Sequence, residues 1–303
     1  MRILVVGAGA TGGYFGARLA QAGRDVTFLV RERRFQQLQQ TGLVLKTPDG
    51  SEVIQPQLAQ AGSLDGHYDL IILTVKSFAL DQAMNDIAPA VGPDTLIMPI
   101  LNGMRHFDTL RARFGDKVIG GLCKINATLG ENGEVMQMTP LHILYYGALD
   151  GHNDARLQRV DEALRAAQFD TVFADNIISE LWEKWLLLST LGAVCCIARG
   201  NTQQVLTSQG GEALLQGVFG EVLAVLSAEG YQQRPAVTAK IYEMLNNPQA
   251  AMTSSMYRDL TQGFEIEADQ VIGDLLVRGA RSGVVTPLLN AVYVNLQVYV
   301  QNR

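Results

Sequence analysis

Three glycines near the start of the chain constrain its fold more than any other feature of the sequence. Gly7, Gly9 and Gly12 have the spacing G-x-G-x-x-G. They follow a short β-branched run, residues 3–6, and precede a segment with helical character. In such a motif the first glycine permits a tight turn, the second lets a pyrophosphate approach the backbone, and the third lets helix and strand pack closely. The pattern predicts a dinucleotide-binding βαβ unit.

The backbone of this glycine-rich loop is the predicted pyrophosphate site, together with the N–H groups at the start of the helix. Its members are Gly7, Ala8, Gly9, Ala10, Thr11 and Gly12. A glycine-rich turn that binds no ligand is the alternative. A second strand-like segment, residues 25–30, follows the helix and favours the nucleotide-binding interpretation.

The residue after the second strand distinguishes between the two nicotinamide dinucleotides. Enzymes that use NAD usually carry Asp or Glu there, which hydrogen-bonds the ribose hydroxyls. This chain has Arg31, followed by Glu32, Arg33 and Arg34. A guanidinium suits a 2′-phosphate because of its full charge and bidentate geometry, so we predict NADP(H). The alternative is a solvated run of charges that begins the next helix.

Two later strands also end in polar residues. The apolar segment 68–76 ends at Lys76, and the segment 94–103 ends with Asn102 and Gly103. Ligands of open α/β sheets gather at the carboxyl ends of the strands, so both side chains are expected at the ligand-binding edge. Lys76 could instead begin a charged loop, and Asn-Gly is a common turn pair. Their occurrence at the same edge favours a binding site.

A chain of 303 residues is long for a single hydrophobic core. The pattern of apolar residues also changes twice along it. Residues 121–149 show short alternating runs, which we interpret as antiparallel strands added to the first sheet. After residue 175 the strand signals fade and helical periodicity dominates. The sequence therefore predicts an α/β fold with an NADP-binding Rossmann-like domain, residues 1–175. An all-α substrate and catalytic domain, residues 176–303, follows, with the substrate in the cleft between them.

Composition narrows the possible functions. The net charge of −6 argues against nucleic acid as a general partner. The three cysteines and four histidines show no metal-binding spacing, so we expect no metal site. The longest apolar run, residues 185–198, is shorter than the roughly 20 residues that span a bilayer. We expect a cytoplasmic protein that acts on a small molecule and binds no membrane; its apolar helical domain could support a homodimer.

One cation interrupts the most apolar stretch of the chain, residues 179–196. Four leucines three, four or seven positions away share the helical face of Lys184: Leu181, Leu187, Leu188 and Leu191. A charge on an apolar face is costly unless something compensates it. Glu180 stands four residues earlier, where it could form a helical ion pair with Lys184 at the surface. If it does not, the lysine is a candidate for a chemical role.

Five separated segments together resemble the ketopantoate reductases (2-dehydropantoate 2-reductases). In chain order they are "VVGAGATGG", "ILNGM", "LWEKW", "TSSM" and "FEIEADQVIG". The resemblance covers nearly the whole chain. It implies that NADPH delivers hydride to the 2-oxo carbon of ketopantoate, which yields pantoate for pantothenate and coenzyme A synthesis.

The resemblance also implies roles for individual residues. Lys184 matches the catalytic lysine of the W-x-K motif, and Glu267 matches its active-site partner in E-x-D. Asn102 of N-G-M is expected to contact both substrate and cofactor, Lys184 is also expected to bind the substrate, and Glu267 the cofactor. Ser255, before Met in S-S-M, is expected to bind the substrate, and Lys76 of T-x-K the cofactor.

The chemistry of hydride addition agrees with these roles. Negative charge builds on the ketone oxygen, and a positioned ammonium such as that of Lys184 stabilises the charge and supplies the proton. Glu267 can orient the lysine or hold the substrate hydroxyl, although it could also be an ordinary acidic residue in the first turn of a helix. Ser255 can donate to the substrate carboxylate, and Asn102 can bridge substrate and nicotinamide.

The sequence departs from the family pattern one and two helical turns after the lysine. Ketopantoate reductases often carry substrate-binding asparagines there, whereas this chain has Leu188 and Gly192. Leucine cannot hydrogen-bond a hydroxyl or carboxylate, so the pocket should discriminate between substrates differently. The substrate is therefore either ketopantoate in a rearranged pocket or a related, more apolar 2-oxo acid. Ser189 and Thr190 could compensate, but they point to other faces of the helix.

Two other functions compete with this one. A 2-hydroxy acid or opine-type dehydrogenase would share the two-domain plan, but many such enzymes rely on a catalytic histidine and none here lies in a recognisable motif. A non-catalytic NADPH sensor would bind the cofactor without turnover. The joint presence of Lys184, Glu267 and Asn102 argues against a sensor, because a sensor needs no proton donor.

Overall fold

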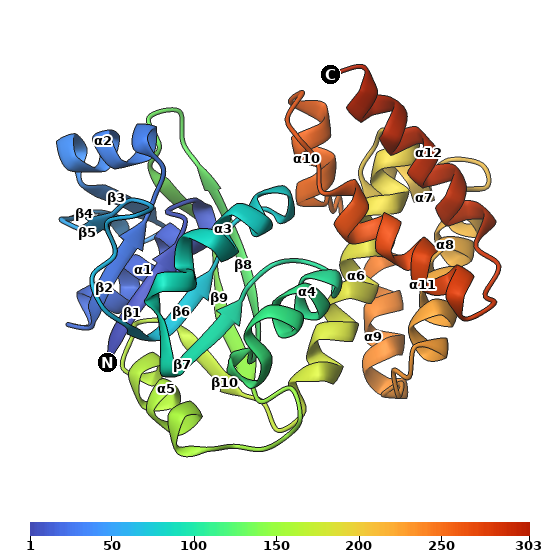
Figure 1. Ribbon diagram of the computed structural model, residues 1–303. Coiled ribbons are helices and arrows are strands. Elements are labelled where there is room, and N and C mark those ends of the chain that lie inside the picture. Colours follow the sequence, from blue (N-terminus) through green and yellow to red (C-terminus); the bar gives the residue numbers. More distant parts are fainter. The chain divides into compact units, whose positions relative to one another are not determined.

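Contacts within the chain divide it into two units in the computed structural model, which describes residues 1–303 (Figure 1). The N-terminal unit comprises Met1–Leu101 and His106–Ile178. The C-terminal unit comprises Asn102–Arg105 and Ser179–Arg303. The four residues from Asn102 thus group with the C-terminal unit, although they closely follow a strand of the N-terminal one.

A five-stranded parallel sheet forms the first layer of the N-terminal unit, in the order β5-β2-β1-β6-β7. Its strands are β1 (Arg2–Val6), β2 (Asp25–Leu29), β5 (Gln57–Ala59), β6 (Tyr68–Leu73) and β7 (Val91–Pro99). Strands β1 and β6 are almost wholly buried, as expected for apolar runs at the centre of a parallel sheet. The predicted α/β fold is therefore confirmed.

The strands after residue 120 do not extend the parallel sheet, so that part of the prediction is wrong. They form a second sheet in the order β10-β9-β3-β4, with β8 paired to β9. Its strands are β3 (Leu43–Thr47), β4 (Gly50–Ile54), β8 (Gly120–Leu129), β9 (Val135–Gly147) and β10 (Asp170–Phe173). The hairpin β3–β4 offers β9 a free edge, where Leu45 pairs with Val135, so the strands join this hairpin instead.

Helix α1 (Ala10–Gln21) packs against strands of both sheets, and this position explains its apolar sequence. Its side chains join the core of the N-terminal unit; Phe15 makes an edge-to-face contact with Phe169, with ring centroids 5.0 Å apart. The other α-helices of this unit are α2 (Glu32–Thr41), α3 (Leu80–Ile87), α4 (Arg105–Phe114) and α5 (Ala155–Arg165). Short 3₁₀ turns cover Ser77–Ala79, Ala88–Ala90 and Gly115–Lys117.

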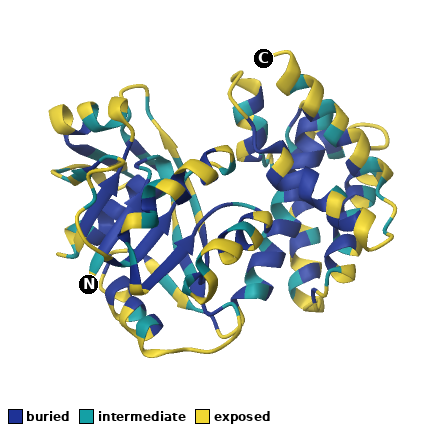
Figure 2. Cartoon of the chain, viewed as in Figure 1, coloured by how far each residue is buried: buried dark blue, intermediate teal, exposed yellow.

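The C-terminal unit is helical, as predicted (Figure 1). Its helices are α6 (Ile177–Ala198), α7 (Thr202–Leu206), α8 (Gly211–Ala228), α9 (Pro235–Leu245), α10 (Ser255–Thr261), α11 (Asp274–Arg281) and α12 (Pro287–Gln301). A five-residue π-helix, η4 (Asp269–Gly273), leads directly into α11. Most of α6 is buried, and the long apolar stretch is thus the central helix of this unit (Figure 2).

Two helices of this unit are long and apolar enough to span a membrane by length and composition alone. They are α6, whose apolar window is 72% buried, and α8, whose window is 39% buried. The apolar segment is thus longer than the run of residues 185–198 suggests. A buried core helix has the same composition as a membrane-spanning one, and α6 packs as a core helix.

Candidate active site

The glycine-rich loop joins β1 to α1 and has the geometry that its sequence predicts. Gly7 adopts a φ of +98°, in the left-handed region that favours glycine. A Cβ atom on Gly12 would lie 2.2 Å from both the Gly7 carbonyl oxygen and Thr74 Oγ1. A Cβ on Gly9 would meet no atom within 4 Å. Packing therefore requires Gly12, whereas the lack of a side chain at Gly9 keeps the backbone there open to a ligand.

The start of α1 adds an electropositive end to this loop. Gly9 is the N-cap residue, no side chain caps the first turn, and the first turn contains no acidic residue. Its N–H groups and the helix dipole therefore favour an anion. The loop fits the pyrophosphate of a dinucleotide on steric and on electrostatic grounds.

Arg34 is a residue of this region whose role the sequence does not reveal. It lies in the first turn of α2, and its Nε donates to the carbonyl oxygen of Ala8 in the loop, at 3.1 Å. Its Nη1 donates to Gln37, whereas its buried Nη2 has no partner. Burial lowers the pKa of Arg34. The only sequence signal was its place in the run of charges after β2, which does not separate it from its neighbours.

Arg31, the predicted 2′-phosphate ligand, is the N-cap residue of α2 and follows the carboxyl end of β2. Its backbone is extended and its side chain is exposed. Lys76 follows β6, the strand that pairs with β1. Thr74 links this strand end to the glycine-rich loop, because its Oγ1 lies 3.1 Å from the Gly7 carbonyl oxygen and 2.9 Å from that of Val6, to which it donates. Arg31 lies two residues after the end of β2 and Lys76 three residues after the end of β6, and both strands pair with β1.

In the C-terminal unit a pocket brings together three of the predicted residues from distant parts of the chain. It is lined by Asn102, Leu188, Ser254, Ser255, Met256, Asp259, Glu267 and Val271. Glu267 is 8% exposed, and Ser255 is exposed. The adjacent Ser254 caps α10 by accepting a hydrogen bond from the Tyr257 N–H at 3.0 Å. The capping role falls to Ser254, and the Ser255 hydroxyl makes no hydrogen bond within the chain.

Lys184 lies on α6 one turn before Leu188, is half-buried, and does not itself line this pocket. The ion pair with Glu180 does not form. Glu180 accepts a hydrogen bond from Arg234 Nη2 at 2.7 Å, and Arg234 also binds Glu183. The Lys184 ammonium has no ion pair or hydrogen bond within the chain. The simple surface explanation of this lysine is therefore wrong.

The substitutions at the two asparagine positions change the wall of the pocket. Leu188 lines it directly. A Cβ on Gly192 would lie 2.9 Å from Met256 Cε, so the methionine occupies the space beside the glycine. Ser189 does not compensate, because it is fully buried and its Oγ donates to the Trp185 carbonyl oxygen at 2.6 Å. The wall around Leu188 is thus apolar and faces a set of polar groups.

A glycine-rich strand-to-helix loop on a parallel sheet, combined with a helical unit that carries a polar pocket, is typical of two-domain dinucleotide-dependent oxidoreductases. The sequence matches the family described as Ketopantoate reductase PanE/ApbA over residues 3–151. It matches the C-terminal part of the same family over residues 176–300. The chain belongs to the ketopantoate reductase family, and the predicted resemblance is confirmed.

The chain is also similar to individual proteins and solved structures. The chain is 34% identical over 300 residues to the uncharacterized oxidoreductase YkpB of Bacillus subtilis (strain 168), with 99% of each chain covered. The crystal structure of 2-dehydropantoate 2-reductase from Geobacter metallireducens GS-15 has a TM-score of 0.88 and 26% identity, and covers 98% of this chain and 99% of that chain. A D-mandelate dehydrogenase solved with NADH and anilino(oxo)acetate has the same fold, with a TM-score of 0.88, 23% identity and coverage of 100% and 99%.

Proposed function

We propose that this oxidoreductase uses NADPH to reduce 2-dehydropantoate (ketopantoate) to pantoate, in the synthesis of pantothenate and coenzyme A. The convergence of Asn102, Ser255 and Glu267 on one pocket carries this proposal. The relative from Geobacter metallireducens, named for this substrate, supports it over nearly the full chain. We also propose a cytoplasmic location and a homodimer.

The residues of the chain would divide the chemistry as follows. A bound nicotinamide cofactor supplies the hydride that reduces the 2-oxo carbon. The glycine-rich loop would hold its pyrophosphate and Lys76 would contribute a further positive charge. Lys184 Nζ would donate a proton to the substrate oxygen as negative charge builds there. No carboxylate of the chain neutralises this ammonium, so its charge is available to the substrate.

The pocket residues would bind and orient the substrate. The Ser255 hydroxyl would donate to the substrate carboxylate, and the Asn102 amide would contact both substrate and cofactor. Glu267 would accept a hydrogen bond from Lys184 or from the substrate hydroxyl and would contact the cofactor. Glu267 lines the same pocket as Asn102 and Ser255, which supports these roles.

The choice of NADPH over NADH can be tested at Arg31. We expect Arg31→Ala to raise the KM for NADPH about 10- to 100-fold, because a hydrogen bond to a charged group contributes about 1.5–3 kcal/mol. The KM for NADH should change less than about threefold, since NADH lacks the 2′-phosphate. Initial rates at saturating 2-oxo acid measure both constants. Arg33→Ala, also at an exposed position of the same charged run, is the control. Equal effects on both cofactors, or a wild-type preference for NADH, would contradict the assignment.

The apolar wall favours a second candidate within the same chemistry, a 2-oxo acid with an apolar side chain. Leu188 and Met256 present no hydrogen-bonding group to the 4-hydroxyl of ketopantoate. A substrate hydroxyl that finds no hydrogen-bonding partner in the pocket weakens substrate binding. An apolar substituent at the same place strengthens binding, because its surface is removed from water. 3,3-Dimethyl-2-oxobutanoate is the matched comparison, because it differs from ketopantoate only in lacking that hydroxyl.

A substitution at Leu188 separates the two substrates. We expect Leu188→Asn to raise the ratio of kcat/KM for ketopantoate to kcat/KM for 3,3-dimethyl-2-oxobutanoate about 3- to 10-fold, as one neutral hydrogen bond contributes about 0.5–1.5 kcal/mol. Leu187→Asn is the matched control, because Leu187 is half-buried on the same helix but does not line the pocket. An unchanged ratio would show that this wall does not face the hydroxyl group.

A further inference from the structure

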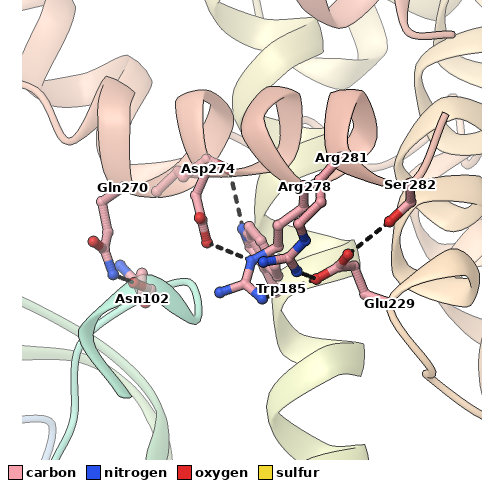
Figure 3. Close-up of polar contacts among 9 residues, drawn as sticks. Asn102, Trp185, Glu229, Gln270, Asp274, Arg278, Arg281 and Ser282 are labelled. Carbon is pink, nitrogen blue, oxygen red and sulfur yellow. Dashed lines mark hydrogen bonds and ion pairs between the residues drawn. The ribbon is translucent and has the colours of Figure 1, made fainter. Parts of the chain in front are cut away.

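We propose that Gln270 is a positioning residue that fixes the backbone of Asn102 and so orients the Asn102 side chain in the pocket. The inference rests on the proposed function for the role of Asn102, but the contact itself does not. Gln270 is 5% exposed, and its Nε2 donates a hydrogen bond of 2.9 Å to the Asn102 carbonyl oxygen (Figure 3). This bond joins residues 168 positions apart in the sequence. A buried amide is costly to leave without its partner, so the bond should persist in the folded protein.

The turn formed by Asn102 and Gly103 also lies against the backbone of Gln270. Gly103 adopts a φ of +80°, and a Cβ on it would lie 2.7 Å from the Gln270 carbonyl oxygen. Gln270 thus contacts the turn through its side chain on the Asn102 carbonyl and through its backbone beside Gly103. The peptide group between Asn102 and Gly103 is therefore contacted at its carbonyl oxygen by the Gln270 side chain and on its Gly103 side by the Gln270 backbone. The direction in which the Asn102 side chain leaves the backbone is fixed with it.

The local structure around Gln270 connects it to two more of the predicted active-site residues. Gln270 belongs to the π-helix η4, which begins two residues after Glu267. The next residue, Val271, accepts a hydrogen bond from Trp185 Nε1 at 3.0 Å. Trp185 is 1% exposed and directly follows Lys184 on α6. The segment from Glu267 to Val271 therefore contacts two other parts of the proposed site. Gln270 binds the backbone of Asn102, and Val271 binds Trp185, the residue next to Lys184.

The end of this segment is itself anchored. Asp274, the first residue of α11, binds Arg278 Nε at 3.0 Å, and Arg278 Nη1 binds Glu229 of the segment after α8 at 3.1 Å (Figure 3). The Ser282 hydroxyl also donates to Glu229, at 2.8 Å. Ion pairs at buried positions hold their partners in one geometry. Single π-helical turns within α-helices occur frequently at functional sites, and η4 is such a turn with its C-terminal neighbour held by ion pairs.

Loss of the Gln270 donor should act on catalysis through Asn102. We expect Gln270→Met, which keeps the length of the side chain but removes the donor, to lower kcat/KM for the 2-oxo acid about 10- to 100-fold. A displacement of about 1 Å in a substrate-positioning group has effects of this size. The Kd for NADPH should change less than about threefold, because the proposed pyrophosphate site belongs to the N-terminal unit and Asn102 would be only one of several cofactor contacts. Gln216→Met, at an exposed position on α8, is the control.

A double-mutant cycle shows whether the effect runs through Asn102. If it does, Gln270→Met combined with Asn102→Ala should lower kcat/KM no further than Asn102→Ala alone. Multiplied effects of the two substitutions would overturn the inference and leave Gln270 with a general structural role. Gln270→Glu, which keeps the shape of glutamine, repeats the cycle if the methionine variant does not fold.

Hydrogen exchange measured by mass spectrometry tests the contact without any turnover. In Gln270→Met the peptide covering residues 102–105 should exchange at least about fivefold faster than in the wild type. The peptide covering residues 7–12 should be unchanged. Unchanged exchange at residues 102–105 would overturn the inference. A wild type that binds NADPH but reduces no 2-oxo acid would instead overturn the proposed function, and the exchange result would still decide the role of Gln270.

Discussion

We expect Lys184→Ala to lower kcat for 2-oxo acid reduction by about 10²–10⁴-fold, the usual contribution of a positioned general acid. The reason is the state of this lysine in the structure. Glu180, its nearest candidate partner on α6, is engaged by Arg234, so the ammonium is not committed to an ion pair. It lies one turn before Leu188, which lines the pocket that Asn102, Ser255 and Glu267 share.

The measurement is steady-state oxidation of NADPH with a 2-oxo acid, alongside a fluorescence titration of NADPH binding. The Kd for NADPH should stay within about threefold of the wild-type value, since the proposed pyrophosphate loop belongs to the N-terminal unit and Lys184 to the C-terminal one. Lys240→Ala, at an exposed position on α9, is the matched control and should leave kcat unchanged. Turnover within about threefold of the wild type in Lys184→Ala would refute its role as the proton donor.

Two alanine substitutions in the glycine-rich loop should have opposite consequences. A Cβ on Gly12 would lie 2.2 Å from a backbone oxygen, so Gly12→Ala should lower the free energy of unfolding by about 1–3 kcal/mol or more. Gly9 has a φ of −79°, which alanine adopts freely, and a Cβ there would meet no protein atom. Gly9→Ala should therefore leave stability within about 0.5 kcal/mol of the wild type. It should nevertheless weaken NADPH binding at least about tenfold, because its methyl group would lie where we propose that the pyrophosphate approaches the backbone.

Urea denaturation and NADPH titration of both variants separate stability from binding. Gly220→Ala is the control, because Gly220 also lacks neighbours for a Cβ but belongs to α8. Normal NADPH affinity in Gly9→Ala would mean that the cofactor does not approach the backbone at this residue. The predicted pyrophosphate site would then have to be placed elsewhere.

Local sequence patterns predicted the elements of the chain well, because these patterns act over a few residues. The spacing of Gly7, Gly9 and Gly12 reports a turn whose steric requirements are local. Burial of β1 and β6 appears directly in their continuous apolar runs. Helical periodicity likewise predicted the long helices of the C-terminal unit, but it missed the short helices α7 and α10 and did not distinguish the π-helix η4 from the α-helix that follows it.

Contacts between distant segments were not predictable in this way. The sheet that contains β8 and β9 depends on the pairing of Leu45 in β3 with Val135 in β9. Nothing in the sequence of either strand indicates that the two strands pair. Glu180 had a plausible partner four residues away, yet Arg234 competes for it from another helix. Arg34 stood among several charged residues, and only the fold shows that it reaches the carbonyl oxygen of Ala8.

The sequence by itself determined the parallel α/β unit, the helical unit and the family. Each of these depends on short motifs and on periodicity, which can be recognised without knowing any tertiary contact. Only the tertiary structure decided which candidate residues share a pocket and what holds them there. Asn102 groups with the C-terminal unit, and Gln270 binds it from 168 residues away. Such a bond depends on the path of the whole chain between the two residues, and this path is set by packing rather than by local propensity.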